Sequence, residues 1–325
     1  MPEFQAYRMS APDAPASFVT MQDGELSPGD VLVRVAYSSV NFKDALAHAG
    51  RNAIVRQYPR VGGIDLTGTV EQSGDPRFPP GLPVILHGFG VGVDHDGGYA
   101  HYARAPAQWV LPLPETLGLL DAATLGVAGY TTALAIDAME LNGLTPDAGP
   151  IAVTGATGGA ASVAIDLLAA RGYHVCAITG KAQEADYLKK LGAAEVLPRE
   201  TLAPSKRPMD KATWAGAIDS VGGEALAALL RSMQLNGVVA AFGNAGGPEL
   251  ATTVLPFILR GVRLLGINGN SPMPLRTRIW QRLATDLRPR HLESIRRVIT
   301  FEELPAALAT VLAGGARGRF VVEMR

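Results

Sequence analysis

The chain has 325 residues and a mass of 34.0 kDa, enough for about two domains at roughly 150 residues each. The chain has 29 basic residues (Lys and Arg together) and 30 acidic ones (Asp and Glu together). The resulting net charge of −1 predicts no general attraction to nucleic acid or to an anionic membrane. The single cysteine, Cys176, excludes an intrachain disulfide and a zinc site built from several thiolates, which favours the cytoplasm.

Membrane-directed segments are not expected. The first ten residues include Glu3 and Arg8 and lack the apolar core of a secretory signal. The most apolar window, residues 122–136, is about 15 residues long, short of the roughly 20 needed to cross a bilayer.

Residues 1–124 contain short runs rich in β-branched side chains, separated by Gly and Pro. The expected strands are 31–40, 68–70, 83–86 and 109–111. Short strands between turn signals indicate an irregular antiparallel barrel.

From about residue 150 to 268, apolar strands alternate with helix-length amphipathic segments. The strands are predicted at 151–154, 174–179, 194–197, 216–219, 238–242 and 262–267, and the helices at 159–171, 182–191, 224–233 and 254–260. This alternation predicts an α/β domain with a doubly wound parallel sheet, the Rossmann fold. A short helix and a strand at 319–324 follow, and we expect 272–325 to complete the first domain (1–124), leaving 125–271 as the second.

Residues 155–162 read GATGGAAS between a predicted strand and a predicted helix. Glycines let the backbone turn sharply beside a pyrophosphate, whose charge the helix N-terminus favours. Thr157, Gly158, Gly159 and Ala160 are therefore candidate dinucleotide-binding residues, the alternative being a purely structural turn.

The second strand of this region ends in Thr179, Gly180 and Lys181, where an NAD enzyme would place an acidic residue. A cation there, joined by Arg199 after the third strand, favours the 2′-phosphate of NADP. The alternative is that Lys181 is a solvated loop cation. Asp219, at the end of the fourth strand, could border the ligand or simply cap the next helix.

Several stretches resemble the medium-chain dehydrogenase/reductases, which join a GroES-like barrel to a Rossmann domain. They are SSVNFKDA at 38–45, GIDLTGTV at 63–70, GDPRF at 74–78, GFGVG at 88–92, AGYT at 128–131, WAGAID at 214–219 and PFILR at 256–260. Within that superfamily the chain is similar to the zinc-free quinone-oxidoreductase-like branch, and especially to its NADPH-dependent acryloyl-CoA reductases.

The resemblance implies no catalytic zinc, because Asn41 and Ile64 stand where zinc alcohol dehydrogenases carry a Cys and a His. His87, His95 and His101, with Asp94 and Asp96 nearby, are interpreted as a polar loop rather than a metal site. Asp96 also replaces a tryptophan usual in acryloyl-CoA reductases, which bears on substrate preference.

Hydride addition to an alkene conjugated to a carbonyl needs orientation and hydrogen bonds rather than a metal. Asn41 could donate such a bond near the nicotinamide, and Asp44 and Asp65 could shape the polar side of the cleft or be structural partners. The resemblance also implies cofactor contacts. They are expected from Phe42, where the family more often has tyrosine, and from Thr131, Asn244, Ile258 and Gly269.

A CoA ester carries several phosphates, which Arg51, Arg56 and Arg60 could meet, unless these are solvated loop arginines. The leading hypothesis is thus an NADPH-dependent reductase of 2-enoyl thioesters such as acryloyl-CoA. The alternatives are an NADPH:quinone oxidoreductase and a non-catalytic NADPH-binding protein. Residues 262–269 resemble the strand through which this superfamily pairs, so a homodimer is expected.

Overall fold

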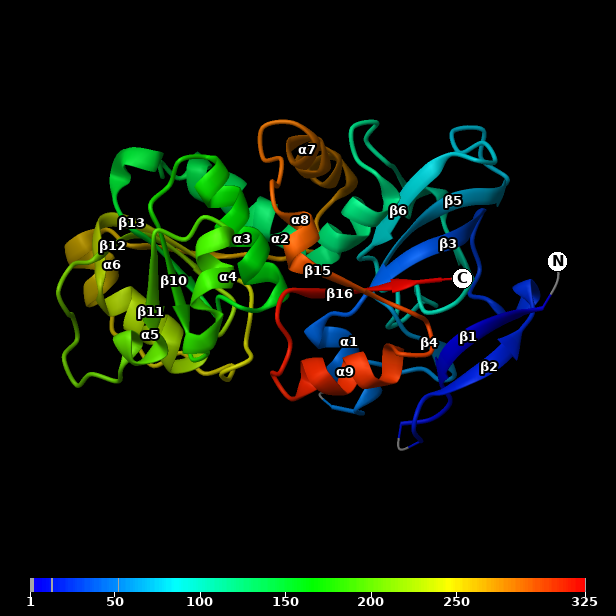
Figure 1. Cartoon of the computed structure of the whole chain (residues 1–325), viewed down its shortest axis with the longest axis horizontal. Coiled ribbons are helices and arrows are strands. Elements are labelled where there is room, and N and C mark those ends of the chain that lie inside the picture. The colour runs from blue at the N-terminus through cyan, green and yellow to red at the C-terminus, as the bar shows by residue number, and fades with distance from the viewer. Residues whose placement is uncertain (1–2, 13, 52, 325) are drawn as a thin grey trace. The chain divides into compact units, whose positions relative to one another are not determined.

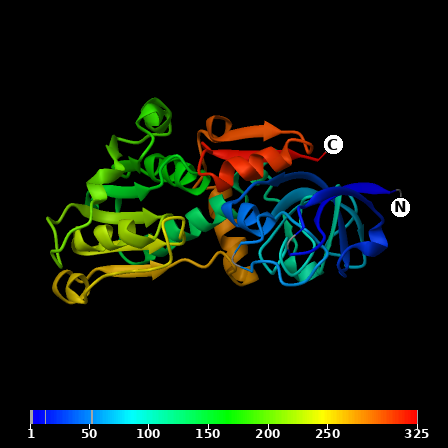
Figure 2. The same ribbon diagram turned by 90° about the horizontal axis from the view of Figure 1, so that it is seen from below.

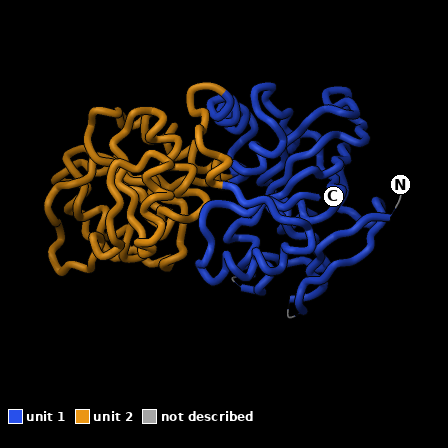
Figure 3. The backbone as a smooth tube through the Cα atoms, viewed as in Figure 1, with its two compact units in different colours: residues 1–127, 270–284, 296–325 blue, residues 128–269, 285–295 orange. Residues whose placement is uncertain are grey.

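The computed structural model describes residues 3–12, 14–51 and 53–324. The chain forms two compact units (Figure 3). Unit 1 comprises Met1–Val127, Asn270–Ala284 and Arg296–Arg325, and unit 2 comprises Ala128–Gly269 and Thr285–Ile295. Residues 285–295 thus belong to unit 2, although the sequence analysis grouped them with 272–325.

Unit 2 is built on a six-stranded parallel sheet in the order β11-β10-β9-β12-β13-β14. The strands are β9 (Ile151–Thr154), β10 (Val175–Thr179), β11 (Glu195–Pro198), β12 (Trp214–Asp219), β13 (Met233–Ala241) and β14 (Arg263–Gly266). Strand order turns back between β9 and β12, which is the topology of the Rossmann fold. The predicted fold class of this region is therefore confirmed.

Helices connect these strands on both faces of the sheet (Figure 1). They are α3 (Gly159–Ala170), α4 (Ala185–Lys190) after the 3-10 turn η4 (Ala182–Glu184), α5 (Gly223–Arg231) and α6 (Leu255–Arg260). The chain runs outward from β9 to β11 in one direction and from β12 to β14 in the other. Because the crossovers are right-handed, α3 and α4 lie on one face of the sheet and α5 and α6 on the other.

One strand is longer than the sequence predicted. β13 begins at Met233, inside the predicted helix 224–233, whereas the predicted strand began at residue 238. Asn236 has φ of +58° and the pairing of β13 with β12 shifts register nearby, so the strand continues through an irregularity at this point.

Unit 1 contains a seven-stranded sheet in the order β15-β16-β3-β5-β6-β8, with β7 also paired to β3. Its strands are β3 (Val31–Ser39), β5 (Asp65–Ser73), β6 (Pro83–His87), β7 (Tyr102–Ala105), β8 (Leu111–Pro112), β15 (Arg296–Ile299) and β16 (Arg319–Glu323). The C-terminal strand β16 lies beside β15 and pairs with β3, so the end of the chain completes unit 1 (Figure 2).

A second sheet of unit 1, β2-β1-β4, contains two strands that the sequence analysis missed, β1 (Phe4–Met9) and β2 (Ser17–Met21), together with β4 (Arg60–Val61). The predicted strand at 109–111 is only partly right, because Trp109 closes the 3-10 turn η2 (Ala107–Trp109) before β8. Helices α1 (Phe42–His48), α7 (Met273–Ala284) and α9 (Leu304–Leu312) also belong to this unit, and α8 (Leu292–Ile295) belongs to unit 2.

Helix α2 (Leu119–Leu141) runs across the boundary at residue 127 and is interrupted by Gly126, with φ of 49° and ψ of −154°. It is the one helix among the described residues that is long and apolar enough to cross a membrane. Since 67% of its most apolar window is buried inside the protein, α2 has the burial of a core helix.

Candidate active site

The turn after β9 lets a ligand approach the backbone closely. Gly155 has φ of +59°, and a Cβ on it would lie 3.0 Å from Ser220 Oγ, so this position favours glycine on two counts. Gly158 caps the 12-residue helix α3, whose first turn includes Gly159 and Ala160. The first N–H groups of a helix lack intrahelical acceptors and the helix dipole attracts anions. A pyrophosphate therefore fits this turn.

Asp219 ties the end of β12 to the end of β9. Its Oδ1 accepts a hydrogen bond from Thr154 Oγ1 (2.7 Å), and its Oδ2 accepts one from the Gly222 N–H (2.8 Å). Burial raises the pKa of Asp219. Ser220 Oγ in turn donates to the Thr154 carbonyl (3.1 Å). Asp219 thus has the structural role, holding in place the loop that packs against Gly155.

Four of the expected cofactor residues come together at the carboxyl ends of β10 and β11. Thr179 Oγ1 accepts a hydrogen bond from the Lys181 N–H (3.0 Å). Gly180 faces Arg199, because a Cβ on Gly180 would lie 3.2 Å from Arg199 Cδ. The Arg199 side chain is 77% exposed, with Glu200 beside it at 3.4 Å. Two cations therefore lie near this edge of the sheet, where they could meet a phosphate.

Two further expected residues lie close to the same edge. Asn244 follows β13 and is exposed, in a loop where a Cβ on Gly243 would lie 1.9 Å from the Ser220 carbonyl oxygen. Gly269 follows β14 by three residues. Both positions are at the carboxyl ends of strands, the usual ligand edge of this fold.

Thr131 and Ile258 have different surroundings. Thr131 lies on α2, next to Thr132, whose Oγ1 donates to the Ala160 carbonyl (3.1 Å), so this part of α2 contacts the glycine turn. Ile258 is 68% exposed on α6, two residues before Arg260, whose guanidinium binds carbonyls at the start of β13. Helix α6 itself packs against β13.

In unit 1, a buried polar network surrounds Asn41. Asn41 Nδ2 donates to Asp44 Oδ2 (3.0 Å) and to Asp65 Oδ2 (3.1 Å), and its Oδ1 accepts a hydrogen bond from Arg319 (3.0 Å). Asp65 also accepts hydrogen bonds from the Ser39 N–H (3.0 Å) and from the Val127 N–H (2.9 Å) that follows the break in α2. A second Arg319 nitrogen contacts Ser39 Oγ.

This network assigns positioning roles to Asn41 and Asp65. A primary amide has two N–H donors, and both donors of Asn41 are directed at carboxylates. Asp65 is 2% exposed and bound from both oxygens. These contacts support the alternative that Asp44 and Asp65 are structural partners within unit 1. A direct catalytic role for Asn41 or Asp65 stays a prediction.

Asp44 should make stability depend on pH. Burial, and then the neighbouring Asp65, raise the pKa of Asp44 from 3.8 to about 7. The folded state holds the proton more tightly than the unfolded chain, so the free energy of unfolding should fall as pH rises from about 4 towards 7, by up to about 1.4 kcal/mol per pH unit. Urea unfolding at pH 5, 6 and 7 measures this slope, which Asp44→Asn should reduce. Asp94→Asn, which removes an exposed carboxyl, should leave the slope unchanged, and an unchanged slope in Asp44→Asn would contradict the assignment.

The remaining predicted residues of unit 1 divide into exposed and buried positions. Phe42 is the first residue of α1 and is 38% exposed, and Arg51 and Arg56 are exposed after that helix. Arg60 is not available as expected, because it is buried and paired with Asp96 at 3.2 Å. Asp96 is therefore a structural partner of Arg60.

The three histidines have separate structural neighbours. His87 is 1% exposed and accepts a hydrogen bond from Trp280 Nε1 (2.8 Å). His95 Nε2 contacts the Arg104 carbonyl at 2.8 Å, and His101 contacts the ring of Phe301 at 5.8 Å between centroids. The polar-loop interpretation therefore holds for His95 and His101, which lie in the loop between β6 and β7, while His87 is the last residue of β6.

Arg319 was missed by the sequence analysis. It is 3% exposed and lies 3.6 Å from Asp65 Oδ2, yet it is separated from Asn41 by 278 residues in the chain. The one local signal is an arginine at the start of an apolar strand, RFVVE, which needs a buried partner.

Comparisons with known proteins agree with this architecture. Residues 27–115 match the alcohol dehydrogenase GroES-like domain, and residues 159–285 match the zinc-binding dehydrogenase family. The chain is 47% identical over 302 residues to the acrylyl-CoA reductase AcuI of Ruegeria pomeroyi, covering 92% of each chain. The chain therefore belongs to the medium-chain dehydrogenase/reductases. Within them it is an oxidoreductase of the quinone-oxidoreductase-like branch.

Two further relatives have solved structures. The putative quinone oxidoreductase YhfP of Bacillus subtilis is 44% identical over 326 residues, 99% of each chain, and its structure with NAD bound gives a TM-score of 0.96 with full coverage of both chains. The structure of YhdH from Escherichia coli K-12 with bound NADPH also gives a TM-score of 0.96, at 43% identity, covering 99% of this chain and 100% of that one.

A catalytic zinc ion does not fit the two positions where the family's zinc enzymes hold one. Ile64 has a hydrocarbon side chain, and the Asn41 amide is hydrogen-bonded to Asp44, Asp65 and Arg319. Neither side chain offers the thiolate or imidazole that zinc prefers.

Proposed function

We propose that the protein is an NADPH-dependent reductase of 2-enoyl thioesters such as acryloyl-CoA. The cofactor assignment is carried by one observation, the convergence of Thr179, Gly180, Lys181 and Arg199 at the ends of β10 and β11. The substrate class is supported by the likeness to acrylyl-CoA reductase over 92% of the chain.

Each group of residues has a defined task in this proposal. The N-terminus of α3 holds the pyrophosphate, and Lys181 and Arg199 hold the 2′-phosphate. NADPH, when bound, supplies a hydride for the β-carbon of the conjugated alkene. Asn41 and Asp65 keep the polar network of unit 1 in one arrangement, and Phe42 presents an apolar ring without the hydroxyl that a tyrosine would add. Water can supply the final proton.

The exposed guanidinium groups of Arg51 and Arg56 are the proposed partners of the CoA phosphates. Arg51→Ala and Arg56→Ala should each raise KM for acryloyl-CoA by about 5–10-fold, the loss of about 1 kcal/mol of charge-assisted binding, without changing quinone turnover. Arg77→Ala is the matched control, since Arg77 is exposed and paired with Asp75 at 2.7 Å. Equal KM values in all three variants would show that these arginines are only solvated.

The test of the function is NADPH oxidation by the purified protein with acryloyl-CoA, crotonyl-CoA or a benzoquinone. Turnover of acryloyl-CoA with little quinone reduction supports the proposal. The likeness to the putative quinone oxidoreductase YhfP favours the alternative, an NADPH:quinone oxidoreductase, which turnover of quinone alone would establish. No turnover with any of them, together with NADPH binding, would indicate a non-catalytic binding protein.

We further propose a cytoplasmic homodimer that pairs through β14. This strand is at the end of the parallel sheet, and the preceding segment exposes Val254, Ile258 and Leu259 by 64%, 68% and 59%. An unpaired strand edge beside exposed apolar side chains favours pairing with a second copy. Sedimentation velocity at micromolar concentration distinguishes a dimer from a monomer.

A further inference from the structure

Unit 2 has a pocket at the end of its sheet opposite the glycine turn. A cavity of about 510 Å³ is bordered by residues at the amino ends of β9 to β12 and by residues of α5 and the loop that follows β11. Its lining includes Pro150, Cys176, Glu195, Asp210, Trp214 and Ala228. Because ligands of this fold normally bind at the carboxyl ends of the strands, this cavity is separate from the cofactor edge.

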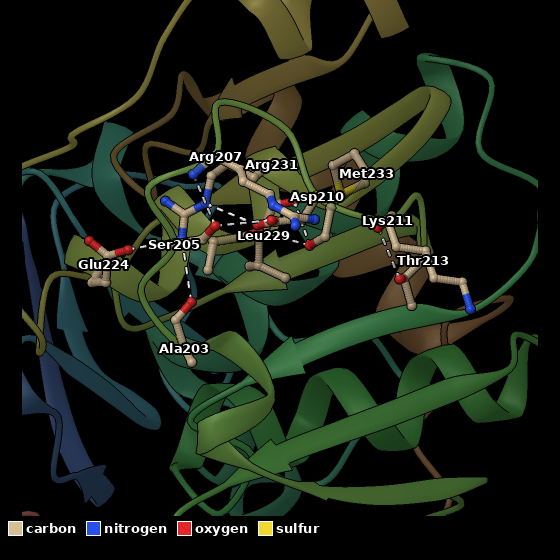
Figure 4. A network of polar contacts seen from close by, with 12 residues as sticks. Ala203, Ser205, Arg207, Asp210, Lys211, Thr213, Glu224, Leu229, Arg231 and Met233 are labelled. Carbon is tan, nitrogen blue, oxygen red and sulfur yellow. Dashed lines mark hydrogen bonds and ion pairs between the residues drawn. The ribbon is translucent and has the colours of Figure 1, made fainter.

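Polar contacts hold one wall of the cavity in place (Figure 4). Asp210 accepts hydrogen bonds from Ser205 Oγ (3.1 Å) and from Arg231 Nε (3.2 Å). Arg231 is 6% exposed and also pairs with Glu224 at 3.0 Å. The loop between β11 and β12 is thereby fixed against α5, so the cavity has a defined wall.

Three potential metal ligands lie together at the amino ends of β10 and β11, and two of them, Cys176 and Glu195, line this cavity. Side chains two residues apart on a strand point to the same face, so His174, just before β10, and Cys176, within it, share one face. Glu195 is the register partner of Cys176 on β11 and shares that face. The ligand atoms of His174, Cys176 and Glu195 all lie within 4.8 Å of one another, and His174 Nε2 is 2.9 Å from Glu195 Oε1.

The Cys176 thiol is the buried member of this cluster. It is 1% exposed, lines the cavity, and makes no hydrogen bond to any residue in the part of the chain that the structure describes. Burial, and then the Glu195 carboxylate, raise the pKa of Cys176 to about 11. A cation at this point would reverse the second effect, because it stabilises both anions at once.

We propose that His174, Cys176 and Glu195 bind a zinc ion. A thiolate, a carboxylate and a neutral imidazole together offset the two charges of Zn²⁺, and the soft thiolate and the imidazole favour zinc over Mg²⁺ or Ca²⁺, which prefer oxygen. Three protein ligands leave a fourth tetrahedral position for water, on the side of the cavity.

The geometry requires only small movements. Ligands at 2.0–2.3 Å from a tetrahedral zinc ion lie about 3.3–3.8 Å apart from one another. His174 and Glu195 would therefore replace their direct hydrogen bond by bonds to the same ion, and side-chain rotations that move the ligand atoms by about 1 Å are enough. His174 and Glu195 are 48% and 53% exposed, so an ion can enter from solvent. The sequence pattern did not indicate this site, because the pairing of β10 with β11 brings Glu195 to Cys176 from 19 residues further along the chain.

The zinc site would be independent of the nucleotide. From Cys176 to Gly180 the strand covers four residues, about 13 Å at roughly 3.3 Å per residue. His174→Ala and Glu195→Gln should therefore remove metal binding and leave the affinity for NADPH unchanged.

The experiment is a Co²⁺ titration of the full-length protein after chelator treatment and dialysis. The wild type should take up one Co²⁺ per chain with a thiolate-to-cobalt charge-transfer band that Zn²⁺ abolishes by displacement. His174→Ala and Glu195→Gln each remove a direct ligand. They should therefore weaken Co²⁺ binding by more than roughly 10–100-fold, the effect of losing a residue that only orients a ligand. Glu249→Gln, which removes an exposed carboxylate elsewhere in unit 2, should bind like the wild type.

Two results would overturn the proposal. One is a wild type that develops no charge-transfer band, and the other is a band of unchanged strength in His174→Ala and Glu195→Gln. Thermal unfolding provides a second measurement: Zn²⁺ should raise the Tm of the wild type and of Glu249→Gln but not that of the exposed-residue variant His174→Ala.

Discussion

Replacing Arg319 with methionine is expected to lower the free energy of unfolding by about 3–5 kcal/mol, because the substitution leaves two carboxyl groups buried without their cation. Arg319 contacts the Asn41 amide at 3.0 Å and lies 3.6 Å from Asp65 Oδ2, while Asp44 shares the same amide. Methionine keeps most of the side-chain volume, so the loss reports the charge rather than a cavity. Urea denaturation followed by circular dichroism measures it.

Two controls separate this effect from general damage. Arg77→Met removes an arginine of an exposed ion pair and should cost less than about 1 kcal/mol. The double variant Arg319→Met with Asp65→Asn should be less destabilised than the sum of the single variants, because the second change removes an unpaired charge. Additive losses, or a loss in Arg319→Met no larger than in Arg77→Met, would contradict the central role of this arginine.

Lys181→Ala and Arg199→Ala should each weaken NADPH binding by about 10–100-fold, equivalent to roughly 1.5–3 kcal/mol for a charge-assisted hydrogen bond. NADH lacks the 2′-phosphate, so its affinity should change by less than about twofold. The physical basis is that Lys181 follows Gly180 directly and that a Cβ on Gly180 would lie 3.2 Å from Arg199 Cδ. Isothermal titration calorimetry with both cofactors gives the ratio directly.

Lys190→Ala is the matched control, since Lys190 is an exposed lysine at the end of α4. It should reduce the affinity for either cofactor only slightly, through general electrostatics that added salt screens. If the Lys181 and Arg199 variants lost NADH and NADPH affinity equally, these residues would not hold the 2′-phosphate, although the glycine turn would still bind the pyrophosphate.

The parallel sheet could be predicted from the sequence because its strands are short apolar runs, most of which are followed by a helix-length segment. Six predicted strands match β9 to β14 within a few residues, apart from the early start of β13. In that strand Asn236 and Gly237 are residues typical of a turn, yet the sheet pairing continues past them. Local propensity yields to tertiary pairing in such cases.

The candidate sites divide in the same way. The glycine turn and Lys181 could be found because their residues are consecutive or lie at a known spacing after a strand. The network around Asn41 could not, because Arg319 reaches it through the pairing of β16 with β3, which no local pattern encodes. For the same reason the contact between Arg60 and Asp96 was missed, and Arg60 was expected at the surface.

Because Cys176 is buried, the rate at which its thiol is labelled measures how often this part of unit 2 opens. A thiol that is 1% exposed, with a pKa raised to about 11 by burial and by Glu195, reacts slowly with a maleimide or disulfide reagent, at a rate set by local opening of the residues that cover it. Since the chain has no other cysteine, the labelling rate reports that one event without mutation. Local fluctuations around Cys176 can thus be followed in the unaltered protein, and a cysteine added at any exposed position can be labelled selectively.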